Sequence, residues 1–237
     1  MSNKYLPYIE DNRLIEFVGV IVDKLEAAIK SSQSKLDSNV IDPFSAVFDA
    51  CIQNITLSDW IVKEKTRQIQ KTMQNQIGTF HENILGSVKG WQRLDVGHVI
   101  DLVNYDRKII AEVKNKYNTT KGNHKKEIYD DLQELINSLE YKKYTGYYVE
   151  IIPKNKKEYD KPFVPSDNRN HSIRRTNEFI RVIDGKSFYN LVTGYDNAFK
   201  MLYESLPRVL FDNFSELQNY EFIKDPLFSD LFQRAYN

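Results

Sequence analysis

Two acids and an amine stand at a spacing that suits metal-assisted chemistry. Asp101 lies in one short apolar segment, and Glu112 and Lys114 lie in a second one, separated by Val113. Alternate residues of a β-strand share a face, so Glu112 and Lys114 point to the same side. A two-residue turn at 105–106 would place Asp101 one diagonal step from Glu112 on that face. The spacing therefore predicts a patch of two carboxylates and one ammonium.

Such a patch suits the hydrolysis of a phosphodiester. Mg²⁺ requires oxygen ligands, and it keeps several waters besides one or two carboxylates. The metal would neutralise charge on the phosphate and lower the pKa of a bound water, which becomes the nucleophile. Lys114 would orient that water or stabilise the transition state as a fixed positive charge. The alternative is a surface hairpin with a salt bridge, which contributes little to stability.

A basic, amide-rich segment surrounds this patch. The whole chain is neutral, with 33 Lys+Arg and 33 Asp+Glu. Between 107 and 126, however, seven residues are basic and one is acidic. This local excess can attract a polyanion, although a solvated lysine-rich loop is the alternative. The side chains that could bond phosphate oxygens or base edges are Asn115, Lys116, Asn118, Thr119, Thr120 and Lys121.

A second candidate contact to nucleic acid is an arginine-rich loop over 168–175. It contains Arg169, Arg174 and Arg175. Arginine bonded to guanine O6 and N7 is the commonest specific base contact, so a GC-rich target would favour such a loop. Phosphate contact or plain solvation is the alternative for each of these arginines.

The surrounding patterns predict the elements that must position the patch. Helical spacing of apolar residues is present over 10–30, after Pro43, from Ser58 to Gly86, over 123–139, and over 187–211 with an interruption at Gly194. Strand patterns are present over 98–103, 108–114, 147–152 and 179–183, with a polar loop over 153–175. This order predicts an α/β (α+β) fold, in which helices flank a mixed central sheet that carries the hairpin.

The length and composition indicate one globular protein. We expect a single domain over 1–237, with a mainly helical part over 1–90, a core sheet with DNA-contacting loops over 91–185, and C-terminal helices over 186–237. The single cysteine, Cys51, excludes an intramolecular disulfide and favours a reducing compartment. The apolar run at 17–22 is far shorter than the ~20 residues that span a bilayer, and acidic residues precede it. We therefore expect no signal peptide and no membrane partner.

Longer stretches around the patch carry a family resemblance. They are residues 81–86 with 90–91, 101–104, 109–120, and 184–189 with 191–194. Asp101 with Glu112-Val113-Lys114 looks like the core of the PD-(D/E)xK nucleases. The longer stretches, over roughly 77–211, resemble a subgroup of type II restriction endonucleases that cut interrupted GGNCC or GGWCC sites. The superfamily motif often has proline before the aspartate, where this chain has Ile100.

The resemblance implies a fold, a reaction and roles for residues. It implies a restriction-endonuclease-like fold and Mg²⁺-dependent cleavage of both strands of a short, GC-rich interrupted palindrome. Asp101 and Glu112 would bind Mg²⁺ with the Val113 carbonyl, Lys114 would be the catalytic lysine, and Glu82 would be a further catalytic acid. Cleavage of both strands of a near-palindrome implies a homodimer. A prokaryotic cytoplasmic enzyme of this kind would act beside a methyltransferase that protects host DNA.

Several alternatives remain open at this level. Asp95 is a rival to Asp101 as the first carboxylate, but it lies outside the hairpin. Glu82 occupies the polar face of its helix, where an ordinary solvated glutamate would also lie, and a lone histidine such as His81 is more often structural than a general base. The chain could instead be a repair or junction-cleaving nuclease of the same superfamily, or a non-catalytic binding module.

Overall fold

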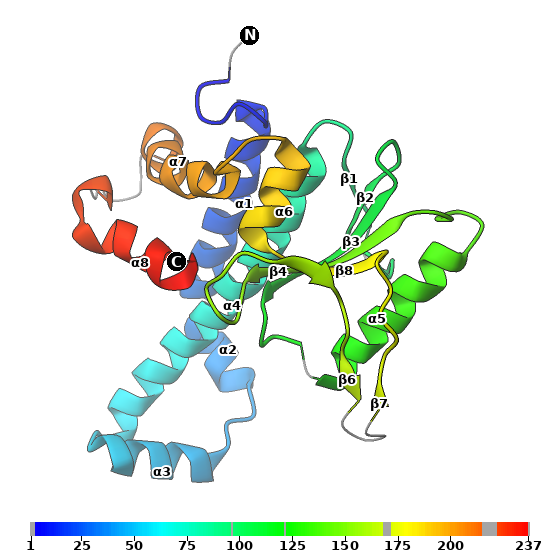
Figure 1. Cartoon of the computed structure of the whole chain (residues 1–237). Coiled ribbons are helices and arrows are strands. Elements are labelled where there is room, and N and C mark those ends of the chain that lie inside the picture. Colours follow the sequence, from blue (N-terminus) through cyan, green and yellow to red (C-terminus); the bar gives the residue numbers. More distant parts are fainter. Residues whose placement is uncertain (1–2, 96, 121, 168–171, 215–221, 237) are drawn as a thin grey trace. The chain divides into compact units, whose positions relative to one another are not determined.

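The computed structural model describes residues 3–95, 97–120, 122–167, 172–214 and 222–236 (Figure 1). The chain folds into two compact units. The first, here called the sheet unit, comprises Met1–Phe17 and Phe80–Asn237. The second, here called the helical unit, comprises Val18–Thr79. The single nuclease domain expected over 1–237 stays a prediction.

The helices and strands follow one another in a mixed order. The helices are α1 (Asp11–Lys30), α2 (Ser32–Ser38), α3 (Pro43–Gln53), α4 (Leu57–Ser87), α5 (Gly122–Asn137), α6 (Gly185–Thr193), α7 (Ala198–Asn213), the 3₁₀ helix η1 (Phe222–Lys224) and α8 (Pro226–Tyr236). The strands are β1 (Gln92–Arg93), β2 (Leu102–Asn104), β3 (Ile109–Lys116), β4 (Thr145–Ile152), β5 (Asp160–Pro162), β6 (Ser166–Asp167), β7 (Ser172–Ile173) and β8 (Ile180–Asp184). Among the described residues, no helix is both long and apolar enough to cross a membrane.

The sheet unit is built around a six-stranded mixed sheet with the order β1-β2-β3-β4-β8-β5. β2 pairs with β1 and β3 in antiparallel fashion, β3, β4 and β8 are mutually parallel, and β5 closes the far edge antiparallel to β8. The apolar residues of β3 and β4 are buried, as expected for parallel strands covered on both faces. The mixed sheet flanked by helices that the sequence predicts is therefore confirmed.

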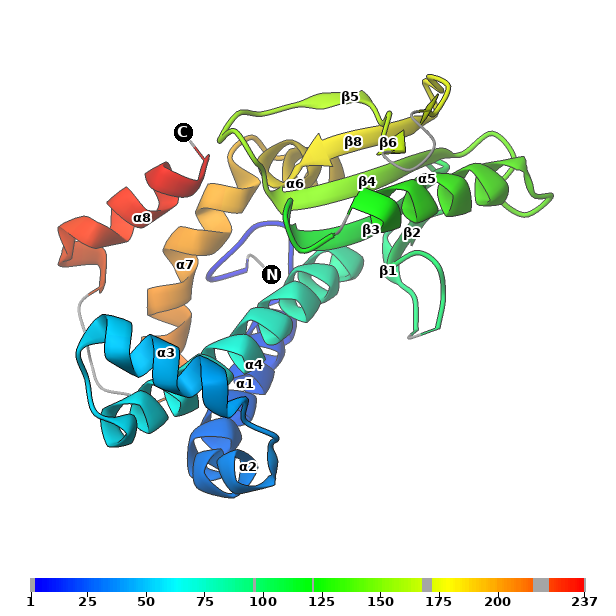
Figure 2. The ribbon, with the colours of Figure 1, turned by 90° about the horizontal axis from the view of Figure 1, so that it is seen from below.

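Helices cover both faces of this sheet (Figure 1, Figure 2). On one face, Tyr148 of β4 belongs to a buried apolar cluster with Leu132 and other residues of α5. On the other face, the neighbouring Tyr147 contacts Phe188 of α6, with ring centroids 6.0 Å apart. At Gly185, a Cβ atom would lie 2.4 Å from the Ile151 carbonyl oxygen. The start of α6 thus packs directly on the backbone of β4.

The hairpin differs from the sequence prediction in its turn. Leu102 pairs with Ala111 and Asn104 with Ile109, so four residues, 105–108, connect the strands. The predicted two-residue turn is wrong because Lys108 adopts the left-handed conformation, with φ 54°, and extends the turn. The predicted pairing of Asn104 with Arg107, and hence the register predicted for Asp101, is therefore two residues off. The short strand β1 is not predicted by the sequence pattern, and the predicted polar loop over 153–175 contains the short strands β5, β6 and β7.

The helical unit contains α2, α3 and the larger parts of α1 and α4. Asp42 caps α3 by accepting a hydrogen bond from the Phe44 N–H at 3.0 Å, and proline occupies the first turn, as the sequence predicts. Ala46 and Ala50 on one side of α3 pack with Trp60 of α4 in a small buried cluster. Trp60 therefore has a packing role.

Candidate active site

Asp101 is held in place by hydrogen bonds of its own backbone and side chain. It directly precedes β2. Its N–H donates to the Ala111 carbonyl at 2.9 Å, and its carbonyl accepts from the Leu94 N–H at 2.8 Å. Its carboxylate accepts the Val113 N–H at 2.7 Å. Asp101 therefore lies beside the strand segment that carries Glu112, closer than the predicted register would have placed it.

Glu112 and Lys114 project from β3 on the same side, as strand alternation requires. The Lys114 ammonium donates a hydrogen bond to the Glu112 carboxylate. The side chains of Lys114 and Glu112 are 28% and 13% exposed, so the pair is only partly accessible to solvent. The hairpin thus brings Asp101, Glu112 and Lys114 together.

The acids of this cluster disfavour one another's charge. Burial raises the pKa of Glu112 above its ordinary value, and the neighbouring Asp101 raises it further, while Lys114 opposes both effects. Burial alone would lower the pKa of Lys114, but Glu112, Asp101 and Glu82 raise it overall. Lys114 is therefore held in its charged form beside a partly buried concentration of acidic groups.

Glu82, on the last turns of α4, is part of the same electrostatic cluster. Burial raises its pKa, and so does the charge of Asp101, while Arg93 and Lys114 lower it. Its carboxylate accepts hydrogen bonds from Arg93 at 3.0 and 3.2 Å. The structure therefore brings the fourth predicted catalytic residue towards the hairpin.

Arg93 is a residue that sequence reasoning missed. It lies in β1, whose two residues are too few to show a periodic pattern. Gly86 of α4 allows its approach, because a Cβ at that position would lie 2.6 Å from the Arg93 Cβ and 2.7 Å from its backbone nitrogen. The glycine in the sequence segment 81–86 was the available signal for this close contact between helix and strand.

The donor set fits a hard divalent cation. Asp101 and Glu112 offer carboxylate oxygens, the ligands that Mg²⁺ prefers, and Val113 lies between Glu112 and Lys114 on the strand. Burial and the charge of Asp101 raise the pKa of Glu112, and a bound cation would offset both effects. In the described parts of the chain, no three His, Cys, Asp or Glu side chains already form a metal-binding group. Because the Glu112 carboxylate accepts a hydrogen bond from Lys114, it would have to turn from Lys114 to bind a cation.

The predicted phosphate- and base-contacting residues after the hairpin lie at the end of β3 and in the following turn. Asn115 and Lys116 are half-buried, whereas Asn118 and Thr119 are exposed. Thr120 is buried, and its hydroxyl has no hydrogen-bond partner among the described residues. Lys121 lies outside the described residues. Exposed contacts to DNA are therefore open to Asn118 and Thr119 more readily than to Thr120.

The arginine-rich loop is described only in part. Arg169 lies outside the described residues. Arg174 forms an ion pair with Asp130 of α5 at 2.6 Å, and the Arg175 carbonyl accepts a hydrogen bond from Tyr129 at 2.6 Å. The Arg175 side chain is exposed. The end of this loop is thus anchored to α5.

His81 and Asp95 have surroundings that differ from those of the hairpin residues: His81 lies in the core, and Asp95 lies at the surface. His81 is buried and its Nδ1 lies 2.8 Å from the Tyr189 hydroxyl. Burial lowers the pKa of this imidazole to about 4, and its ring contacts Phe199. Asp95 is exposed, and its carbonyl accepts the His98 N–H at 3.3 Å. His81 therefore has the environment of a structural core histidine.

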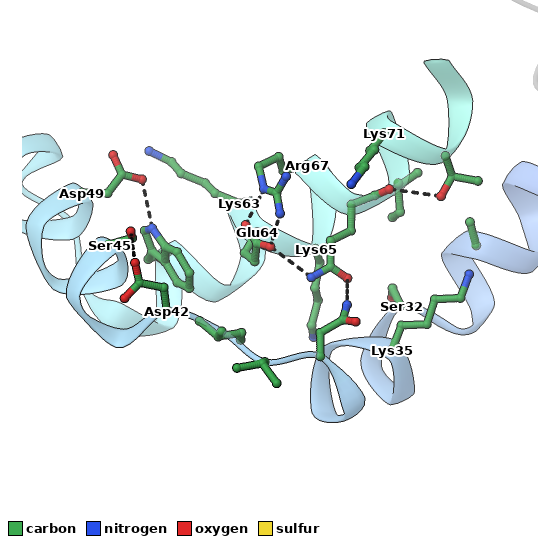
Figure 3. Close-up of a pocket in the computed structure, with 18 of the residues that line it drawn as sticks. Ser32, Lys35, Asp42, Ser45, Asp49, Lys63, Glu64, Lys65, Arg67 and Lys71 are labelled. Carbon is green, nitrogen blue, oxygen red and sulfur yellow. Dashed lines mark hydrogen bonds and ion pairs between the residues drawn. The ribbon is translucent and has the colours of Figure 1, made fainter. Parts of the chain in front are cut away.

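A cavity of about 920 Å³ lies within the helical unit (Figure 3). Polar side chains that line it bond to one another: Arg67 donates to Glu64 at 2.6 Å, and the Trp60 indole donates to Asp49 at 2.9 Å. Among the described residues that line it, none is a predicted site residue. The bond between Trp60 and Asp49 stabilises the packing of α3 against α4.

Comparison with known proteins finds relatives over most of the chain. The family model described as Eco47II restriction endonuclease matches residues 6–215. The chain is 41% identical over 207 residues to the type II restriction enzyme Eco47II of Escherichia coli, and the aligned region covers 86% of each protein. It is 33% identical over 240 residues to the type II restriction enzyme Sau96I of Staphylococcus aureus, and the aligned region covers 99% of this chain and 91% of the relative. The family match includes Glu82 and the whole hairpin.

Proposed function

The chain belongs to the Eco47II restriction endonuclease family, and on this premise we propose that Asp101, Glu112 and Lys114 form its active site. It is a type II restriction endonuclease and acts on double-stranded DNA. The observation that carries the proposal is the convergence of two carboxylates and an ammonium on one partly buried patch.

We propose Mg²⁺ as the cofactor, held by the carboxylates of Asp101 and Glu112 and by the Val113 carbonyl. When bound, Mg²⁺ supplies positive charge against the phosphate and lowers the pKa of water. Asp101 is suited to fix the position of a ligand because three hydrogen bonds hold its backbone and carboxylate. Glu112 is bonded through its side chain to Lys114 and can exchange this partner for a cation.

Lys114 then has the role of a fixed positive charge. Once Glu112 turns away, the ammonium is left on the same face of β3, where it can donate to a phosphate oxygen or orient the attacking water. In the observed arrangement, Glu112, Asp101 and Glu82 outweigh the effect of burial and raise the pKa of Lys114, which favours its charged form. Glu82 acts as the further acid, and its ion pair with Arg93 holds it towards the cluster.

We propose that the target is an interrupted GC-rich palindrome of the GGNCC type, cut in both strands by a homodimer. The proposal rests on the resemblance of residues 81–86 with 90–91, 101–104, 109–120, and 184–189 with 191–194 to enzymes that cut such sites. Contacts to DNA are assigned to Asn115, Lys116, Asn118, Thr119, Thr120 and Lys121 after the hairpin, and to Arg169, Arg174 and Arg175 in the loop before β8. A methyltransferase that modifies the same site would be the functional partner, and the prokaryotic cytoplasm the compartment.

Digestion of a sequenced plasmid tests the proposal. With Mg²⁺, the wild-type protein is expected to give discrete fragments whose ends, once sequenced, fall at GGNCC-type sites. The same reaction in EDTA should leave the plasmid intact. Nicking that follows DNA structure instead of sequence would favour the repair or junction-cleaving alternative. Discrete fragments whose ends share a sequence unrelated to GGNCC would support site-specific cleavage but refute the proposed target.

A further inference from the structure

Helix α3 of the helical unit has apolar residues on two opposite faces. One face, with Ala46 and Ala50, is buried against Trp60. The other carries residues at the spacing i, i+3, i+4, i+7 and i+8, which forms one continuous stripe along a helix. The members of this stripe, here called the α3 stripe, are Phe44, Val47, Phe48, Cys51 and Ile52.

The α3 stripe is open to solvent along its length. Phe44 is 75% exposed, Phe48 is 67% exposed and Ile52 is 82% exposed. A phenylalanine buries 150–250 Å² when it packs fully, so the two phenylalanines alone expose roughly 250 Å². With Val47 and Ile52, the stripe reaches the few hundred Å² at which an apolar patch on a soluble protein marks a contact surface.

The composition of the stripe suits a second copy of the same chain. In a two-fold interface the same surface meets itself, so a charge near the axis would face an identical charge. The stripe carries no charged residue. Asp49, which lies within α3, turns away from it and accepts a hydrogen bond from the Trp60 indole at 2.9 Å. Contact between two stripes therefore places no charged residue of the stripe against its own copy.

The area also fits a dimer. A stable interface buries about 800 Å² on each partner, with an apolar centre enclosed by a polar rim. The stripe supplies a centre of the right size, and two phenylalanines are the kind of aromatic anchor that dominates binding. Ser45, an exposed polar residue beside the stripe on α3, would belong to the rim.

We propose that the α3 stripe is the surface through which two copies of this chain associate. This inference rests on the proposed function, because cleavage of both strands of a palindrome requires one active site for each strand. Two-fold pairing through α3 places the contact in the helical unit. The residues that carry the chemistry belong to the sheet unit.

The test compares the wild-type protein with the double variant Phe44→Glu/Phe48→Glu. Light scattering after size exclusion measures the mass without DNA or Mg²⁺. The wild type is expected at twice the chain mass of 27.9 kDa, and the double variant at the chain mass itself, with self-association weakened about 100-fold or more. The control is Leu139→Glu, which adds one negative charge, as each substitution of the double variant does, at an apolar residue that is 95% exposed in the sheet unit. It should remain dimeric.

Cys51 gives an independent measurement on the same surface. It is the only cysteine of the chain and lies on the stripe. A thiol reagent such as DTNB should react with Cys51 more slowly as the wild-type concentration rises, and rapidly at all concentrations in the double variant. Circular dichroism checks the fold of each variant, and Phe48→Gln serves in place of the double variant if the latter does not fold.

Two results would overturn the proposal: a wild type that stays monomeric at high concentration, or a folded stripe variant that stays dimeric. Association of the wild type with an unrelated protein through the stripe, without self-association, would overturn it as well. If the protein dimerises through the stripe but cleaves no DNA, the proposed interface is supported and the proposed function is refuted.

Discussion

Gly86→Ala should destabilise the protein, although alanine is the better helix former. The new Cβ would lie 2.6 Å from the Arg93 Cβ, 2.7 Å from its nitrogen and 3.0 Å from its Cα. Since two of these atoms are backbone, β1 must shift away from α4. Overpacking of this kind costs about 1–3 kcal/mol, against a gain of about 1 kcal/mol in helix propensity. The shift should also lengthen the hydrogen bonds between Arg93 and Glu82.

The matched control is Gly78→Ala in the same helix. A Cβ at Gly78 meets nothing within 4 Å, so this variant should gain about 1 kcal/mol. The two variants should therefore differ by about 1–3 kcal/mol in unfolding free energy, or several degrees in melting temperature. Thermal melts followed by circular dichroism measure this difference. If Gly86→Ala is stabilised as much as Gly78→Ala, the close contact between α4 and β1 is refuted.

Two further predictions concern His81 and Arg93. The pKa of buried His81 is lowered from 6.5 to about 4, so the unfolded chain takes up a proton as pH falls through this range and the folded protein does not. Between pH 6.5 and 4, the free energy of unfolding of the wild type should therefore fall by about 3 kcal/mol more than that of His81→Gln. Urea unfolding at both pH values measures this difference, and equal losses would contradict the neutral buried imidazole. Arg93→Met should slow DNA cleavage about 10-fold because Glu82 loses its partner, whereas Arg67→Met, which removes an exposed arginine from an ion pair of the same helix, should not; equal rates would remove the role of Arg93.

The sequence predicts the central elements of the sheet unit well because each has a strong local signal. The run from Ile109 to Lys114 is rich in β-branched residues and forms β3, and the apolar face over 123–139 forms α5. The same alternation in β3 correctly places Glu112 and Lys114 on one face. Local pattern and tertiary environment agree at these positions.

Other features depend on contacts that no local pattern encodes. The four-residue turn follows from a positive φ at Lys108, a residue type that does not signal it, so the predicted register of Asp101 is wrong by two residues. The pairing of Glu82 with Arg93 requires α4 and β1 to meet at Gly86. The buried position of His81 likewise follows from helices that pack only in the folded chain. Each of these depends on distant segments.

The central claim is that Asp101, Glu112 and Lys114 catalyse the cleavage of DNA, and Lys114→Ala tests it most directly. Single-turnover cleavage of a labelled duplex in Mg²⁺, and binding of the same duplex in Ca²⁺, would be measured for this variant, the wild type and Lys142→Ala, an exposed lysine outside the site. We predict that Lys114→Ala cleaves at least about 10²–10³-fold more slowly while it binds the duplex as the wild type does. Cleavage by Lys114→Ala at the wild-type rate would contradict the assignment.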